Sequence, residues 1–113
     1  HPSLKVDLKI KGDIDQLGEV VNINVYRIIQ EAMNNVVKHA KAENIKISLL
    51  KTKESLKIEC SDDGKGFDLK ILKKTKQFGL MGIKERAQAL NGKLNIKSAE
   101  NKGTHLTIVI PTK

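Results

Sequence analysis

The chain has 113 residues, of which 39% are hydrophobic and 30% are charged, so one folded domain over residues 1–113 is expected and a disordered tail is excluded. No apolar stretch approaches the roughly 20 residues that cross a bilayer. The net charge is +8, but no segment interleaves aromatic residues with Lys or Arg, which argues against nucleic acid. Most of the lysines are expected to form a solvated surface, and the surplus favours an anionic ligand such as a nucleoside triphosphate, or an acidic partner.

The first elements differ in their hydrophobic period. Val6, Leu8 and Ile10 alternate with polar residues, which predicts a half-buried strand that ends at Gly12. Residues 22–40 then show helical spacing, with Asn22 or Asn24 as the N-cap. The apolar stripe of this helix is expected to comprise Ile23, Tyr26, Ile29, Met33, Val36, Val37 and Ala40.

Two further strands are expected at residues 45–49 and 56–60, joined by a hairpin turn at 53–55. Cys60 falls on the apolar side of the second strand, so we expect a buried, unreactive thiol, in keeping with a reducing cytosol. Residues 69–78 are expected to form a short helix and a mobile loop.

Helical spacing returns at residues 79–90 and ends before Asn91-Gly92, which suits a C-cap. Strands at 94–96 and 106–110 complete the order β-α-β-β-loop-α-β-β, with a turn at 101–103. Short turns between strands favour antiparallel pairing, and the helices should cover one face of a single sheet. The fold class predicted from the residues is α+β in two layers.

The first helix carries chemically useful side chains. Glu31 and Asn35 are four residues apart and share a face, with Lys38 close to the same line and His39 beside it. A magnesium–triphosphate site needs an oxygen ligand such as an Asn amide, a carboxylate that orients or deprotonates the attacking group, and a cation near the phosphates. A solvated polar face is the alternative for these residues.

Three glycine segments follow. Residues 62–66 read Asp-Asp-Gly-Lys-Gly after a strand, and a buried Asp there can accept a hydrogen bond from an exocyclic amine such as that of adenine. Residues 79–83 open the second helix, where free amides favour anions. Gly103-Thr104 begins the last strand. The alternatives are a plain turn, a hinge and another turn, respectively.

These segments, in this order, resemble the catalytic ATP-binding domain of bacterial sensor histidine kinases, in the GHKL ATPase superfamily. The resemblance runs from Tyr26 to Pro111 and includes the N box (26–40), the G1 box (62–66), the G2 box (79–83) and Gly103-Thr104. The sequences of the N and G2 boxes look most like those of the subfamily containing NarX, DesK and LiaS. The resemblance implies a Bergerat-type α/β sandwich, with a mixed, mostly antiparallel sheet covered on one face by three helices.

The resemblance also implies roles for individual residues and the ligands ATP and Mg²⁺. Asn35 would coordinate magnesium, and Glu31 would be the catalytic base or orienting carboxylate. Asp62 would hydrogen-bond the adenine amine. The other residues implied to contact the nucleotide are Lys38 and His39 near the phosphates, Gly64 and Gly66 beside adenine and ribose, Gly79, Leu80 and Gly82 at the lid, and Thr104 beside the adenine pocket.

Kinases of this type phosphorylate a histidine on a separate dimerisation domain, and nothing in this chain matches that domain. None of His1, His39 and His105 suits the acceptor role. We therefore expect a monomeric domain that binds ATP with little autophosphorylation, from a homodimeric parent that acts on a NarL-type response regulator. Because the chain begins without Met or a signal-peptide pattern, a cytoplasmic domain of a longer protein is expected, and a membrane-anchored parent is compatible.

Two alternatives stay open. Serine kinases of the anti-sigma-factor type share the N and G1 boxes and work without a histidine-bearing helical hairpin. The sequence of residues 79–83 argues against them. A non-catalytic module that binds nucleotide or nucleic acid is supported by the net charge of +8 alone.

Overall fold

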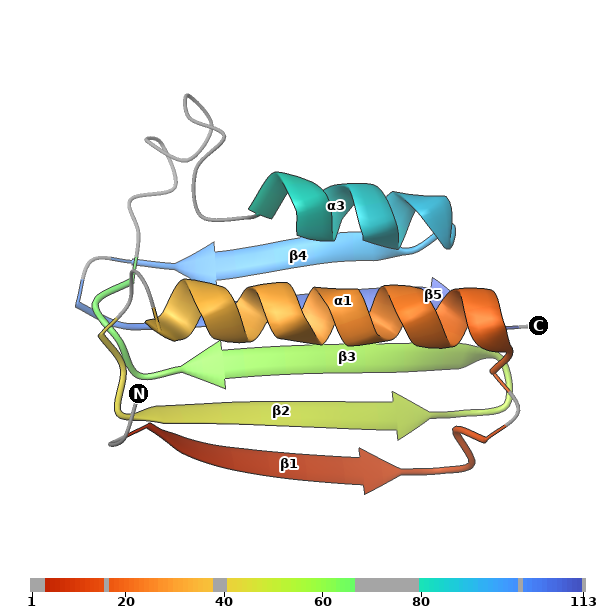
Figure 1. Cartoon of the computed structure of the whole chain (residues 1–113), viewed down its shortest axis with the longest axis horizontal. Coiled ribbons are helices and arrows are strands. Elements are labelled where there is room, and N and C mark those ends of the chain that lie inside the picture. The colour runs from red at the N-terminus through yellow and green to blue at the C-terminus, as the bar shows by residue number, and fades with distance from the viewer. Residues whose placement is uncertain (1–3, 16, 38–40, 67–79, 100, 113) are drawn as a thin grey trace.

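The computed structural model describes residues 4–15, 17–37, 41–66, 80–99 and 101–112. The elements in chain order are β1 (Lys5–Lys11), α1 (Glu19–Asn35), β2 (Asn44–Lys51), β3 (Ser55–Asp62), α3 (Leu80–Ala89), β4 (Lys93–Ser98) and β5 (Thr104–Pro111). They form one five-stranded sheet with α1 and α3 on the same face (Figure 1). The short helix expected at residues 69–78 lies outside the described residues, so the third helix stays a prediction.

The strand order is β1-β2-β3-β5-β4. β1 pairs with β2 in parallel, because the chain crosses through α1 between them, and the other three pairs are antiparallel. The predicted mixed, mostly antiparallel sheet in two layers is therefore confirmed. In the part of the chain that the structure describes, neither helix is long and apolar enough to cross a membrane.

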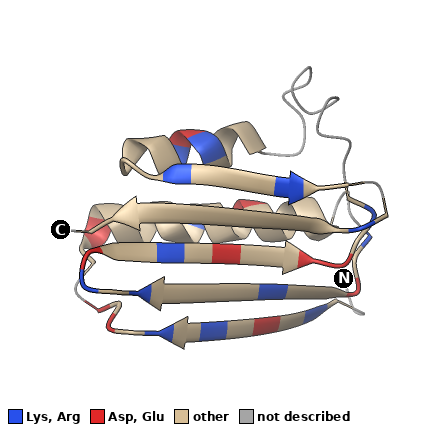
Figure 2. Ribbon diagram, turned by 180° about the vertical axis from the view of Figure 1, so that it is seen from behind, with Lys and Arg blue, Asp and Glu red and all other residues tan. Residues whose placement is uncertain are grey.

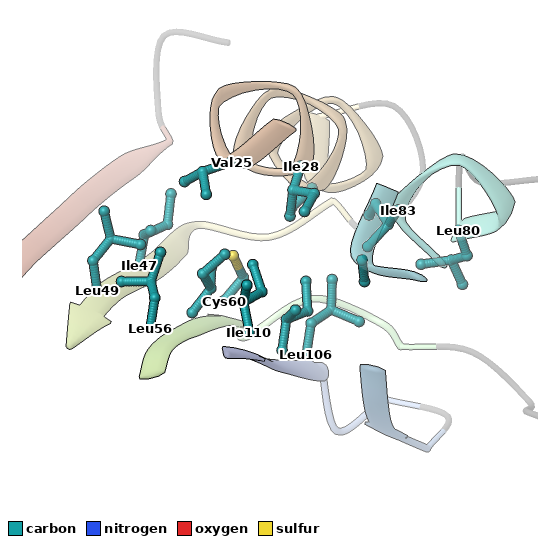
Figure 3. Close-up of a cluster of buried hydrophobic side chains, with 14 of the residues drawn as sticks. Val25, Ile28, Ile47, Leu49, Leu56, Cys60, Leu80, Ile83, Leu106 and Ile110 are labelled. Atoms are coloured by element: carbon teal, nitrogen blue, oxygen red, sulfur yellow. The ribbon is translucent and has the colours of Figure 1, made fainter. Parts of the chain in front are cut away.

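The core lies between the sheet and the two helices, and it is built from the alternate residues that the period-two pattern selected. Side chains from β2, β3 and β5 meet those of α1 and α3 in one apolar layer (Figure 3). Cys60 is buried within it, so its predicted burial is confirmed, and burial raises the pKa of its thiol to about 12, which disfavours the reactive thiolate. The strands carry Lys interspersed with Asp and Glu (Figure 2), and Lys46, Lys57 and Glu59 alternate with buried residues, as expected where the opposite face of the sheet is solvated.

The predicted start of the first helix is wrong. Helix α1 begins at Glu19, and the N-cap position is Gly18, which has a φ of 85° and makes no side-chain cap. Asn24 lies inside the helix instead, where its side chain donates to the carbonyl of Val20 at 2.8 Å. Local sequence did not reveal this start, since the cap residue carries no side chain that signals it.

The predicted apolar stripe of α1 is only partly right. Val36 is buried, and Ile29 and Met33 pack against the core, whereas Ile23 and Tyr26 are 60% and 64% exposed and Val37 is also exposed. Ala40 lies outside the described residues, and the buried residues of α1 itself are Val25, Ile28 and Ala32. Apolar residues occupy more than one side of this helix, so periodicity alone selected a neighbouring stripe. Glu31 and Asn35 are half-buried beside the core stripe rather than opposite it, and this lets them reach into the domain.

β1 is more exposed than predicted. Val6, Leu8 and Ile10 pair in register with buried residues of β2, yet each is about half exposed. The strand is at the edge of the sheet, and α1 and α3 lie over its other strands (Figure 1). The alternating pattern found the strand correctly but could not show that the described helices stop short of it.

At the end of α3 the expected C-cap is present. Asn91 adopts a φ of 59°, and the N–H of Gly92 donates to the carbonyl of Ala87 at 2.7 Å. Asn tolerates this left-handed conformation better than most residues, so it ends the helix and turns the chain into β4.

The centre of the sheet should dominate the stability. Ile58 is fully buried on β3 between Leu49 and Ile108, and we expect Ile58→Ala to lower the free energy of unfolding by about 2–5 kcal/mol through lost burial and a residual cavity. Chemical denaturation measures this. Val109→Ala on the exposed side of β5 is the matched control, expected within about 0.5 kcal/mol of wild type. Equal losses for both variants would contradict this placement of the core.

Candidate functional site

The ends of four secondary-structure elements meet at one end of the strands. These are the C-terminal end of α1, the N-terminal end of α3, the end of β3 and the start of β5 (Figure 1). Between them lies a small pocket, mostly apolar, with a few polar side chains, as is usual for small-molecule sites. Its lining residues are Ala32, Asn35, Val36, Ile45, Cys60, Asp62, Leu80, Thr104 and Leu106.

The pocket unites four of the predicted site residues, namely Asn35, Asp62, Leu80 and Thr104. They come from four different elements, so the sheet topology rather than sequence proximity brings them together. The free volume at the centre is about 20 Å³, which is room for about one water molecule. A ring-sized ligand therefore requires lining side chains such as Leu80 to move apart.

Asp62 is the last residue of β3 and is half-buried at the pocket. Its Oδ1 accepts a hydrogen bond from the N–H of Gly64 at 2.8 Å, which fixes the start of the glycine loop. Burial raises the pKa of the Asp62 carboxyl, the charge of Asp63 raises it further, and the N–H groups of Gly64 and Thr104 oppose the shift. This carboxyl is poorly solvated and would gain from a ligand that donates a hydrogen bond.

Asp63 has a different role from its neighbour. It is exposed, and its carboxylate accepts hydrogen bonds from the N–H groups of Glu43 and Asn44, both at 2.9 Å, and from the side-chain amide of Asn44 at 2.7 Å. The amide of Asn44 is the main reason that the pKa of Asp63 is lowered. Asp63 thus fastens the glycine loop to the start of β2.

Gly66 is needed for close backbone approach. It has a φ of 67°, and a Cβ there would lie 2.1 Å from the carbonyl oxygen of Ala99. Gly103 is similar, with a φ of 77° and a Cβ position 2.1 Å from the carbonyl oxygen of Asp62. Gly64 is buried in the same loop. The glycines therefore hold the loop against the β4–β5 turn, and their contact with a nucleotide stays a prediction.

Thr104 is the one buried polar residue found among the described residues. Its Oγ1 lies 2.8 Å from Oγ of Ser98, which in turn donates to the carbonyl of Gly103 at 3.1 Å. These bonds hold the hydroxyl in a fixed position at the pocket wall.

Asn35 and Glu31 project from the last two turns of α1. Nδ2 of Asn35 is buried and has no hydrogen-bond partner within the described ranges. Oε1 of Glu31 accepts a hydrogen bond from Nη1 of Arg86 on α3 at 2.5 Å, and Oε2 is buried without a described partner. Buried polar atoms are usually satisfied, so these two are open to a polar ligand or to residues outside the described ranges.

Gly82 contacts the same pair, since a Cβ there would lie 2.6 Å from Oε2 of Glu31. Arg86 was not predicted from the sequence, although it follows Gly82 by four residues and so shares its helix face. The other predicted residues, Lys38, His39 and Gly79, lie outside the described residues.

Comparison with known proteins identifies the family. Residues 20–113 match the family described as histidine kinase-, DNA gyrase B- and HSP90-like ATPase. The signal transduction histidine-protein kinase/phosphatase DegS of Brevibacillus brevis is 40% identical over 111 residues, covering 98% of this chain and 28% of that protein. The sensor histidine kinase YdfH of Bacillus subtilis is 47% identical over 90 residues, 78% of this chain and 22% of that protein.

Solved structures agree on the fold. The blue-light activated histidine kinase of Erythrobacter litoralis superposes with a TM-score of 0.78 at 21% identity, covering 97% of this chain and 36% of that one. The catalytic domain of histidine kinase ThkA gives a TM-score of 0.70 at 19% identity, covering 95% and 78%. This chain therefore belongs to the histidine kinase-, DNA gyrase B- and HSP90-like ATPase family and, within it, to the catalytic ATP-binding domains of sensor histidine kinases.

Proposed function

We propose that this single domain binds ATP with magnesium in the pocket between α1 and α3 and presents the γ-phosphate to a histidine that lies outside the chain. The observation that carries the proposal is the convergence of Asn35, Asp62 and Thr104 on one small apolar pocket, where the buried Nδ2 of Asn35 has no partner among the described residues. A mostly apolar pocket with a few polar groups suits a flat base joined to a charged tail.

The base is proposed to bind at the Asp62 end. Asp62 would accept a hydrogen bond from the exocyclic amine of adenine, with Thr104 beside it and the backbone of Gly64 and Gly66 shaping the loop. The burial that raises the pKa of Asp62 supports this, because a poorly solvated carboxylate gains more from a donor than an exposed one does. The apolar walls, including Cys60 and Leu106, would contact the faces of the ring.

The phosphates are proposed to lie between the two helix ends. Asn35 is the last α-helical residue of α1, which residues 36 and 37 continue as a π turn, and Leu80 is the first described residue of α3. A cation is favoured near the C-terminal end of a helix and phosphate near an N-terminal end. Among the described residues no group of three or more His, Cys, Asp and Glu could hold a metal. Magnesium would therefore depend on Asn35 together with phosphate and water oxygens, and when bound it would neutralise phosphate charge.

The transfer step is proposed to rest on positioning. Glu31 would orient or deprotonate the attacking imidazole, while Lys38, His39, Gly79, Leu80 and Gly82 would line the phosphate end. The attacking nitrogen forms a bond to the γ-phosphorus as the bond to the β-phosphate oxygen breaks, leaving ADP. The proposed partners are a dimerisation domain that carries the acceptor histidine and a response regulator of the NarL type. The domain itself is proposed to be a monomer.

Serine kinases of the anti-sigma-factor type are disfavoured, since the relatives reported above are sensor histidine kinases. The chain spans under a third of the length of those relatives, so the wider activity and the partners are part of the proposal.

Thermal unfolding tests the proposal. At ATP–magnesium concentrations about 100 times the dissociation constant, binding should stabilise the domain by about 2.7 kcal/mol. In Asn35→Ala the gain that magnesium adds to ATP alone should be largely lost, because the metal loses its protein ligand. Asn34→Ala, an exposed neighbour on α1, is the control and should keep that gain. No stabilisation of the wild type would refute the function, and a full magnesium effect in Asn35→Ala would refute the metal assignment.

A further inference from the structure

Glu31 is held in place by a residue of the other helix. Nη1 of Arg86 donates to Oε1 of Glu31 at 2.5 Å, and the two side chains are only 31% and 26% exposed. Arg86 follows the fully buried Ile83 by three residues and precedes the buried Ala87, both of which anchor α3 on the core. The guanidinium is therefore presented from a fixed helix, unlike the two free ends of a surface ion pair.

The remaining oxygen of Glu31 has a different environment. Oε2 is buried and has no described partner, and it faces Gly82, where a Cβ would lie 2.6 Å from it. The same Cβ would lie 2.9 Å from Nη1 of Arg86. A Cβ at position 82 would therefore displace the ends of both side chains of the pair. Glycine leaves space for the carboxylate to remain against α3.

These contacts give the two carboxylate oxygens of Glu31 different environments. Oε1 is engaged by Arg86, and Oε2 is kept as an acceptor without a bond in the described part of the chain. Without Arg86, a half-buried carboxylate would lose its counter-charge and turn toward water, since an unpaired charge is costly away from solvent. A carboxylate that acts on a reacting group must be held within a fraction of an ångström of its working position.

We propose that Arg86 is a positioning residue for Glu31 and that glycine at position 82 leaves the space in which the pair forms. The inference deepens the proposed phosphotransfer and rests on it. It makes the working orientation of Glu31 depend on the placement of α3, so the helix that begins at the phosphate end of the pocket also sets the geometry of the catalytic carboxylate. Arg86 itself touches no substrate in this account.

The test compares phosphate transfer with nucleotide binding. The chain is incubated with ATP, magnesium and a histidine-bearing hairpin from a sensor histidine kinase relative, and the dissociation constant for ATP–magnesium is measured by calorimetry. We expect Arg86→Met to slow transfer by about 10- to 100-fold while changing the dissociation constant by less than about threefold. Arg86→Lys should recover part of the rate, because Lys keeps the charge but not the planar fork. Lys84→Met, exposed on the same helix, should change neither quantity.

Two further variants keep the proposal falsifiable if Arg86→Met folds poorly. Gly82→Ala should also slow transfer, because its methyl group displaces the carboxylate from the other side; only its transfer rate is compared, since Gly82 is itself proposed to line the phosphate end. Adding Arg86→Met to Glu31→Gln should cause little further loss, since the positioned group is already gone.

A transfer rate of Arg86→Met within about twofold of the wild-type rate would overturn the positioning role and leave the proposed function intact. The same conclusion would follow if the rate losses of Arg86→Met and Glu31→Gln multiplied in the double variant, as they do for independent residues. A slow Arg86→Met whose rate loss is matched by lost folding, with normal transfer by Gly82→Ala, would also overturn it. A wild-type chain that binds no ATP would refute the proposed function itself.

Discussion

Replacing Asp62 by Asn is expected to weaken ATP binding by about 10- to 100-fold, the loss associated with a hydrogen bond to a charged acceptor. The reason is that the carboxylate lies half-buried at the pocket, so the adenine amine would replace solvation that the protein has already removed. Asn is nearly the same size and keeps one acceptor oxygen, but it lacks the charge, and its NH₂ group opposes a donor. Calorimetric titration with ATP–magnesium measures the change.

The same substitution should leave the unliganded fold at least as stable at neutral pH. Burial raises the pKa of Asp62, so the folded chain holds that proton more tightly than the unfolded chain does. Between the ordinary and the raised pKa, folding takes up a proton, and the contribution of Asp62 to stability falls as the pH rises through that window. Above the window the ionised carboxylate is a standing cost, which Asn removes. Thermal unfolding without nucleotide, followed across this window, would show it.

Asp63→Asn is the matched control, because it changes the adjacent residue in the same way. The pKa of Asp63 is lowered by the amide and N–H donors around it, so its contribution is present above its ordinary pKa and is lost as the pH falls through the lowered value. Asp63→Asn should therefore lower the melting temperature at neutral pH with little effect on the affinity for ATP. If Asp63→Asn weakened binding more than Asp62→Asn, the assignment of the base-binding carboxylate would be wrong.

The sheet was predictable because period two is a local property. Each run of alternating apolar residues in β2, β3 and β5 faces one side of the sheet, and this side is buried by the helices. The turn at Asn91-Gly92 was likewise predictable from residues that accept a left-handed conformation. Such signals depend only on neighbouring residues in the sequence, so they can be recognised without knowledge of the tertiary fold.

The predictions of burial were wrong where tertiary contacts decide which side chains are buried. Tyr26 and Val25 are both apolar, and only the direction of the core shows that Val25 is buried and Tyr26 exposed. Leu8 shares its face with the buried Ile47, but its exposure depends on how far the helix layer reaches. The pairing of Glu31 with Arg86 joins residues 55 positions apart, so no local pattern announces it. Glu31 and Asn35, in contrast, could be selected as candidates because their chemistry and spacing are local.

The substitution Glu31→Gln is expected to have the largest effect on activity. A carboxylate that accepts or orients a proton in the reacting complex contributes about 10²- to 10⁴-fold to the rate, and we expect the rate of phosphate transfer to a histidine-bearing hairpin to fall within that range. The affinity for ATP–magnesium should change little, because Glu31 does not line the pocket that holds Asp62 and Thr104. Single-turnover transfer and calorimetry separate the two quantities.

The size of Gln makes this variant informative. It preserves the volume beside Gly82 and the reach toward Arg86, so a loss of rate reflects the missing charge rather than a cavity. Glu85→Gln, exposed on α3 next to Arg86, removes a charge of the same sign nearby and should leave transfer unchanged. A Glu31→Gln variant that transfers phosphate at the wild-type rate would show that its carboxylate takes no part in the chemistry. The pair with Arg86 would then be a structural link between the two helices and nothing more.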